Sequence, residues 1–199
     1  ASTSKRWKRS LANHTEPRPR EWATLRTKSS WPAIAVDTTR FESPQFHRPI
    51  AEAIEARRTR RALDALSDAQ TLGLIDELCH AQLRSDGPEG VRTRKSAISA
   101  GALHPIDVIV IGDAERAPLL YNDASRLFEI LAVYNEAALA EAVAALRAMA
   151  PDARGHLVVL AGHLARVASA YENPESLLWR DAGAIDQLLA MGAFAAGVA

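Results

Sequence analysis

The chain has 199 residues, of which 48% are hydrophobic and 24% charged, and its formal net charge is zero, a composition typical of a folded domain. The single cysteine, Cys79, excludes an internal disulfide, and no Cys/His cluster has zinc spacing, so no metal site is expected. The sequence contains no apolar run of about eighteen residues and no apolar stretch after its N-terminal charges. We therefore expect a cytoplasmic protein without a membrane span.

Residues 1–48 are predicted to form a basic N-terminal arm, and residues 49–199 the main domain. The arm has ten Lys/Arg against four Asp/Glu, whereas the rest of the chain has fourteen against twenty. Its proline-containing sequence has no sustained helical or strand period and predicts an extended segment. Nucleic-acid binding is not favoured, because the domain is acidic and contains no known binding motif. Large apolar side chains indicate that the arm packs on another surface: Trp7, Trp22 and Trp31.

The first part of the domain is predicted to contain two helices and a strand. Residues 49–56 have a helical pattern, with proline at an allowed first-turn position. Residues 67–70 have the spacing of a capping box, and the helix that they begin is expected to continue to 86–88. Residues 106–111 are apolar apart from Asp107 and predict a buried strand. The apolar residues at helical intervals in the second helix are Leu72, Ile75, Leu78, Cys79 and Leu83.

The second part of the domain is predicted to alternate strands and helices. Residues 119–121 are read as a short strand followed by a turn at 122–123, and residues 156–161 as a second buried strand. Helices are expected over 135–149 and over 177–197. Three residues of the first of these helices are expected to point inward: Leu139, Val143 and Leu146.

Two segments indicate chemistry. The run Arg57-Arg58-Thr59-Arg60-Arg61 follows the first helix, and planar guanidinium groups bind phosphate through charge-assisted, bidentate hydrogen bonds. The loop Ser99-Ala100-Gly101-Ala102-Leu103-His104-Pro105 leads directly into the 106–111 strand, and Gly101 has no Cβ to prevent close approach of a ligand. Each segment alone has an ordinary structural interpretation, as a solvated helix end and as a turn before a strand.

Together with Asp181-Ala182-Gly183-Ala184-Ile185-Asp186-Gln187, these two segments resemble motifs of the nitroreductase superfamily, in the same order. The arginine run is similar to the family's "RRSxR" opening, and residues 99–105 to its "SAGALHP" loop. The resemblance covers residues 50–199 and is strongest to the azoline dehydrogenases, flavin enzymes that oxidise thiazolines and oxazolines in modified peptides. It implies an α+β fold with a central mixed sheet flanked by helices.

The resemblance further implies an FMN-dependent oxidoreductase of natural product biosynthesis that dehydrogenates an azoline, or a related peptide-derived substrate, by hydride transfer to flavin N5. A homodimer, or a second subunit, would complete the flavin site. His104 is interpreted as a structural histidine rather than a catalytic one. The residues that the resemblance implies for FMN binding are Arg57, Arg58, Thr59, Arg61, Ser99, Ala100 and Gly101.

The sequence also departs from this family. Where the azoline-oxidising branch has a Lys-Tyr pair that handles the proton, this chain has Ala170-Tyr171. Tyr171 is the candidate catalytic residue, but a phenol with a pKa near 10 is a poor base without a nearby cation, which Arg166 or Arg180 could supply. An equal alternative is a half-buried aromatic residue at a helix end. Because the family continues beyond its apolar last helix, residues 49–199 are expected to lack its C-terminal part, and the alternative function is a non-catalytic nitroreductase-like subunit that binds a peptide or a partner enzyme.

Overall fold

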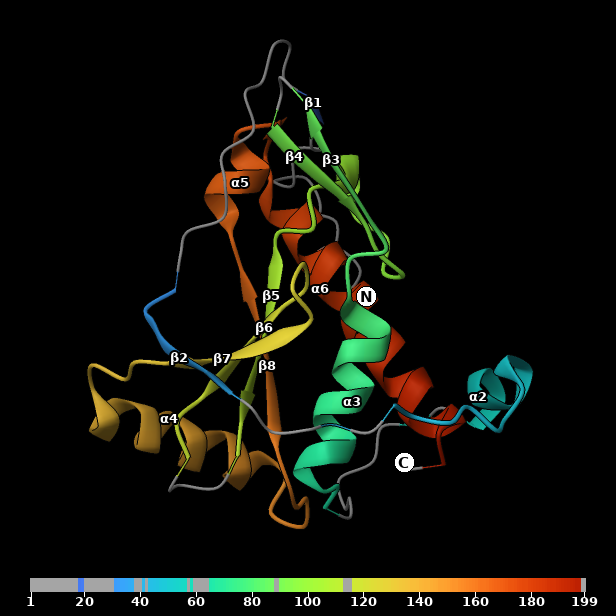
Figure 1. Ribbon diagram of the computed structural model, residues 1–199, viewed down its shortest axis with the longest axis vertical. Coiled ribbons are helices and arrows are strands. Elements are labelled where there is room, and N and C mark those ends of the chain that lie inside the picture. Colours follow the sequence, from blue (N-terminus) through green and yellow to red (C-terminus); the bar gives the residue numbers. More distant parts are fainter. Residues whose placement is uncertain are drawn as a thin grey trace, which may run out of the picture.

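The computed structural model (Figure 1) describes residues 18–19, 31–37, 41, 43–56, 58, 65–87, 90–112 and 116–197. Its elements, in chain order, are β1 (Arg18–Pro19), β2 (Ala33–Asp37), α2 (Ile50–Ala56), α3 (Asp68–Cys79), β3 (Leu83–Gly87), β4 (Gly90–Arg94), the 3-10 turn η1 (Ala100–Ala102), β5 (Ile106–Ile111), β6 (Leu119–Asn122), β7 (Leu127–Leu131), α4 (Glu136–Met149), β8 (Leu157–Gly162), α5 (Leu164–Ala168), β9 (Tyr171–Glu172) and α6 (Glu175–Ala195).

A five-stranded sheet in the order β2-β7-β6-β5-β8 forms the centre of the fold. β5 is its most buried strand and pairs with β8 over six residues, from Ile106 opposite Gly162 to Ile111 opposite Leu157. The predicted strand at 106–111 and the α+β class are thus confirmed. All ladders among the described strands of this sheet are antiparallel, so the expected mixed sheet is corrected in that detail.

Helices α3 and α6 pack together over one face of the sheet and enclose the main core. The predicted capping box is confirmed, because the Ser67 hydroxyl accepts from Gln70 N at 3.2 Å and the Gln70 side chain accepts from Ser67 N at 3.1 Å. The two helices approach closely at Gly192, where an added Cβ would lie 2.3 Å from Leu78 Cδ1. Buried residues from five elements share this core: Leu72, Ile75, Val108, Val110, Leu119, Tyr121, Phe128 and Ile185.

The second helix ends earlier than predicted. α3 stops at Cys79 because His80 adopts an extended backbone, and residues 83–87 then pair with β4 instead of continuing the helix. The side chain of Leu83, which was expected on the apolar face, is therefore 62% exposed. The apolar recurrence ran past the helix because residue 83 matches the helical interval by chance, while β3, the strand to which it belongs, is exposed on both faces and has no burial period of its own.

The later helices and strand form close to their predicted positions, with two differences in burial. Leu139 and Val143 in α4 are half-buried as expected, but Leu146 is 45% exposed, so its inward placement was wrong. No residue of α4 is fully buried. β8 is only partly buried, because it is the edge strand of the sheet rather than a central one.

The opposite face of the sheet has a smaller core of Ile109, Leu120 and Leu131, and Trp31 packs against it. Residues 33–37 add β2 to β7 as the other edge of the sheet, so part of the predicted arm belongs to the sheet. The boundary at residue 48 stays a prediction. Sequence patterns missed β2, β7 and the β3–β4 hairpin.

Candidate functional site

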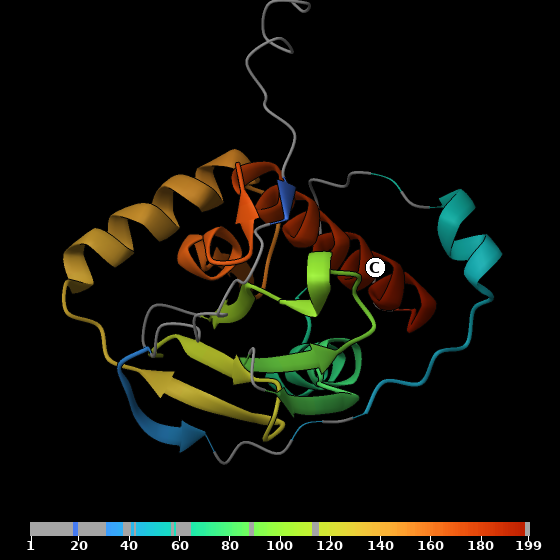
Figure 2. The ribbon, with the colours of Figure 1, turned by 90° about the horizontal axis from the view of Figure 1, so that it is seen from above.

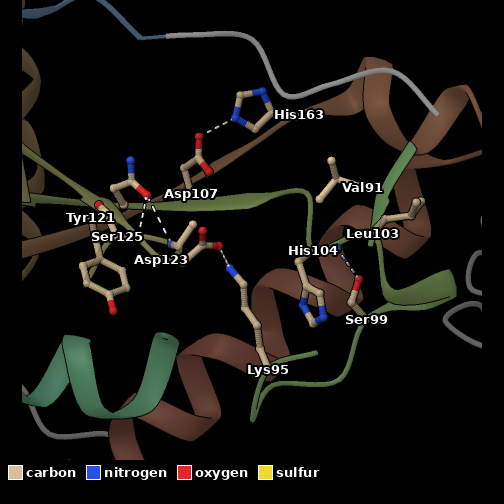
Figure 3. A network of polar contacts seen from close by, with 12 residues as sticks. Val91, Lys95, Ser99, Leu103, His104, Asp107, Tyr121, Asp123, Ser125 and His163 are labelled. Carbon is tan, nitrogen blue, oxygen red and sulfur yellow. Dashed lines mark hydrogen bonds and ion pairs between the residues drawn. The ribbon is translucent and has the colours of Figure 1, made fainter. Parts of the chain in front are cut away.

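The loop between β4 and β5 is held by a buried carboxylate of α6. The Ser99 hydroxyl donates a short hydrogen bond to Asp181 Oδ2, and Ala100 N lies 3.4 Å from Asp181 Oδ1. The same hydroxyl accepts from His104 N at 2.9 Å (Figure 3). Burial raises the pKa of Asp181, and the hydrogen bonds from Ser99 and Ala100 oppose that rise. Asp181 was quoted as part of a motif but was not predicted as a site residue.

This loop has an unusual backbone. Gly101, Ala102 and His104 all have left-handed φ angles, of 59°, 53° and 43°. For residues with a Cβ such angles cost about 1–2 kcal/mol each, and they persist where surrounding contacts fix them. The hydrogen bonds of Ser99 and Asp181 provide that fixation. His104 is buried and donates its backbone N–H to the loop, in agreement with a structural role.

Two arginines donate hydrogen bonds to carbonyl groups of the same loop. Arg92 Nη1 donates to Gly101 O at 2.8 Å. Arg166, which is 6% exposed, donates from Nε to Leu103 O at 2.7 Å and from Nη2 to Val91 O at 2.8 Å. Burial, and then the charge of Arg92, lower the pKa of Arg166. Arg166 therefore links the loop to β4 by donating to a carbonyl group of each.

Tyr171 lies directly against this loop. A Cβ added to Gly101 would lie 3.0 Å from the Tyr171 hydroxyl oxygen, so the phenol and the glycine backbone are in contact, although 70 residues separate them in the chain. Tyr171 is half-buried in β9. Arg180, the other cation considered for this tyrosine, is exposed on α6. Two features that the sequence singled out separately, the loop and the tyrosine, therefore meet at one place.

A buried histidine–carboxylate pair begins two residues beyond the loop. His163 Nε2 lies 2.5 Å from Asp107 Oδ2 (Figure 3). Trp31 Nε1 donates to the same oxygen at 2.7 Å. Both partners of the pair are about nine-tenths buried, with side chains 9% and 10% exposed. Sequence reasoning missed this pair. The signal was Asp107 itself, because a charged residue in an otherwise apolar strand needs a buried partner.

An ion pair lies on the opposite side of β5 from His163 in Figure 3. Lys95 Nζ pairs with Asp123, and the Lys95 side chain is 7% exposed. Both residues line a small cavity with Cys79 and Tyr121. Burial raises the pKa of Cys79 to about 12, which makes this thiol a poor nucleophile.

Arg58, the described residue of the predicted arginine run, follows α2, which packs far from the loop within one chain. Arg57, Thr59 and Arg61 fall outside the described residues, and Arg58 is exposed, two residues after α2. α2 packs on the C-terminal end of α6, where the backbone N–H groups of residues 47 and 48 donate to Ala195 O. Asp181 and Ala195 are 14 residues apart in α6, which is about 21 Å along a helix. Figure 2 shows the same separation of α2 from η1.

Comparisons with known proteins support the fold. No family model matches the chain, and no curated protein matches it. A solved structure described as a "putative nitroreductase" from Ralstonia eutropha JMP134 is similar, with a TM-score of 0.56 and 18% sequence identity over 92% of this chain and 82% of that chain. The chain thus has a nitroreductase-like fold. Among the described residues, no helix is long and apolar enough to span a membrane, and no group of three or more His, Cys, Asp or Glu is arranged to bind a metal.

Proposed function

We propose that this protein is an FMN-dependent oxidoreductase, with the flavin bound against the loop of residues 99–105 and beside Tyr171. The observation that supports the proposal best is the contact between the Tyr171 hydroxyl and Gly101. The sequence had marked the first as the candidate catalytic group and the second as a place of close ligand approach. Their meeting in space was not required by either prediction.

The residues present fit a flavin in a particular way. Gly101 is exposed, and because it has no Cβ the Tyr171 phenol can lie against its backbone, so the exposed glycine and the phenol together form the surface proposed for the flavin. The hydroxyl of Ser99 donates to Asp181, so we assign Ser99 and Ala100 to shaping the loop, while Gly101 faces the cofactor. Asp181 is then a positioning residue, because it acts through the loop.

The phosphate group of FMN needs cations, and Arg58, the described residue of the arginine run, follows α2 at the other end of α6 from the loop. We propose that Arg57, Arg58, Thr59 and Arg61 of a second copy bind it. Within one chain, a cofactor bound to both the loop and Arg58 would have to extend along two thirds of α6. A dimer that places α2 of one copy near η1 of the other removes this difficulty.

When bound, FMN would supply the hydride acceptor. The chain itself would position the substrate and move a proton, and Tyr171 Oη is the group at the loop that can give or take one. Arg92 and Arg166 bring positive charge to the same loop through their contacts with Gly101 and Leu103. The narrower proposal, that the substrate is an azoline in a peptide, rests on the resemblance described above.

The alternative function, a non-catalytic subunit that binds a peptide or partner enzyme, has two observations in its favour. Ala170 occupies the position of the family lysine, and β1 of the arm pairs with the strand that contains Tyr171. Turnover of an azoline peptide by the isolated protein would exclude it. A protein that binds FMN without any turnover, and that gains activity with a second flavin subunit, would favour it.

Flavin binding is tested by titrating the purified protein with FMN and following the visible absorbance band. We expect a shifted band and retention of FMN on gel filtration. Arg57→Ala combined with Arg61→Ala should reduce retention at least tenfold, while Arg84→Ala, at an exposed arginine of the β3–β4 hairpin, should leave it unchanged. A wild-type protein that leaves the FMN spectrum unchanged would refute the proposal.

The shared site is tested by mixing two defective variants. One variant has the Arg57→Ala and Arg61→Ala changes, and the other has Gly101→Val in the loop. If each site takes its arginines from one copy and its loop from the other, refolding an equal mixture restores about a quarter of the sites, because half of the dimers are mixed and each has one intact site. No restoration would place both segments in the same chain's site.

A further inference from the structure

Residues 18–19 and 31–37 of the N-terminal arm contact the folded domain at three separate places. Residues 33–37 pair with β7 at the edge of the sheet. Trp31 donates its indole N–H to the buried Asp107. Residues 18–19 pair with Tyr171–Glu172 as a two-stranded antiparallel ladder, in which Arg18 lies opposite Glu172 and Pro19 opposite Tyr171. The first two contacts fasten the arm to the sheet, whereas the third brings it to the candidate site.

The third contact is made by main chain. β9 is two residues long and is followed by Asn173, whose φ is +52°, so it offers a short docking edge. Extended segments bind such edges through backbone hydrogen bonds, which do not depend on a particular side chain. β9 also presents the phenol that contacts Gly101. A segment paired with β9 is therefore held beside the loop proposed to bind flavin.

The arm sequence suits an edge of this kind. In a Pro-Arg-Pro-Arg sequence only the two arginines have backbone N–H groups. When such a sequence is extended, every second residue directs its N–H to the same side, so both arginine N–H groups lie on one side. Such a segment can pair on one side, while its other side lacks the donors to recruit a further strand. The register agrees, since the arginine lies opposite Glu172.

Two exposed carboxylates near the edge favour a basic ligand, because the nearby Arg92 and Arg166 already donate to carbonyl groups of the loop and of β4. Glu172 is exposed on β9, and Glu175 is exposed at the start of α6. The arm has ten basic residues against four acidic ones. Opposite charges on two binding surfaces increase both the rate and the specificity of association.

We propose that Tyr171–Glu172 is a docking edge for an extended, basic, proline-containing peptide, and that Arg18–Pro19 of the arm occupies it as a built-in ligand. An external peptide of the same kind must displace the arm to reach Tyr171. The use of this edge for substrate rests on the proposed function, but peptide docking can be measured without flavin.

The probe is a fluorescein-labelled synthetic peptide with the sequence of residues 14–24, titrated with the full chain and followed by fluorescence anisotropy without FMN. Arg18→Pro in the protein removes the backbone N–H of the arm residue that lies opposite Glu172, whereas the control Arg18→Ala retains that N–H. We expect Arg18→Pro to bind the peptide about three- to tenfold more tightly than Arg18→Ala does, the range expected for one backbone hydrogen bond.

A second measurement keeps the Arg18→Pro protein and changes the peptide. Methylation of the backbone nitrogen of Arg18 in the peptide should weaken its binding to the Arg18→Pro protein by about three- to tenfold. Equal affinities of the two protein variants, or of the two peptides, would overturn the docking edge. If the protein binds the peptide but not FMN, the docking edge is supported and the proposed function is refuted. If it binds FMN but not the peptide, only the docking edge is refuted.

Discussion

Replacing Gly101 by alanine tests the contact on which the proposed site depends. The added methyl group perturbs two things. The backbone of residue 101 has a φ of +59°, which disfavours any residue with a Cβ, and the new Cβ would lie 3.0 Å from the Tyr171 hydroxyl oxygen. Gly101→Ala and Tyr171→Phe, alone and combined, form a double-mutant cycle that separates these two effects.

The left-handed backbone should cost about 1–2 kcal/mol of unfolding free energy in Gly101→Ala. The contact should add about 0.5–1 kcal/mol, since the phenol is at the end of a side chain and can shift by a few tenths of an ångström. Tyr171→Phe removes the oxygen that the methyl group meets. The loss of unfolding free energy in the double variant should therefore be smaller than the sum of the two single losses by about 0.5–1 kcal/mol.

The free energies are measured by urea denaturation, followed by tryptophan fluorescence. Gly197→Ala is the matched control, because residue 197 has a φ of +75° and an added Cβ there meets no atom within 4 Å. Its combination with Tyr171→Phe should be additive. Additivity within about 0.3 kcal/mol for Gly101→Ala and Tyr171→Phe would refute the contact between phenol and loop.

Three further predictions concern α6 and the core. Gly183→Ala should stabilise the protein by about 0.5–1 kcal/mol, because an added Cβ meets nothing within 4 Å, whereas Gly192→Ala should destabilise it by about 1–2 kcal/mol, because its Cβ would overlap Leu78; thermal unfolding measures both. Burial raises the pKa of Asp181, so the folded state binds this proton more tightly than the unfolded state, and wild type should lose stability relative to Asp181→Asn as the pH rises from 4 to 7 in urea titrations. Cys79 should react with a thiol reagent at pH 8 only after unfolding, because it is buried and its pKa is raised to about 12.

Each of these predictions has an opposing outcome. A stabilising Gly192→Ala would mean that α3 and α6 are not in close contact at Leu78. A wild-type stability that rises with pH relative to Asp181→Asn would mean that the folded state favours the charged carboxylate. Fast labelling of native Cys79 would place the thiol at the surface.

The sequence predicted best those elements that local interactions specify. The capping box of residues 67–70 begins α3, and the apolar, β-branched run of residues 106–111 forms β5. Both signals lie within a few residues of the element that they define. The end of α3 and the hairpin that follows it were not predicted, because β3 is exposed on both faces and has no burial period. β2 was missed for the same reason, as four of its five residues are exposed.

The sequence by itself therefore determined the main helices, the central strand and the presence of a glycine loop before that strand. The tertiary structure decided what the loop contacts. Asp181 and Tyr171 reach it from 70 and more residues away, and the arm returns to β9 across most of the chain. Such contacts depend on how the sheet and α6 bring distant segments together, and local periodicity has no information on that arrangement.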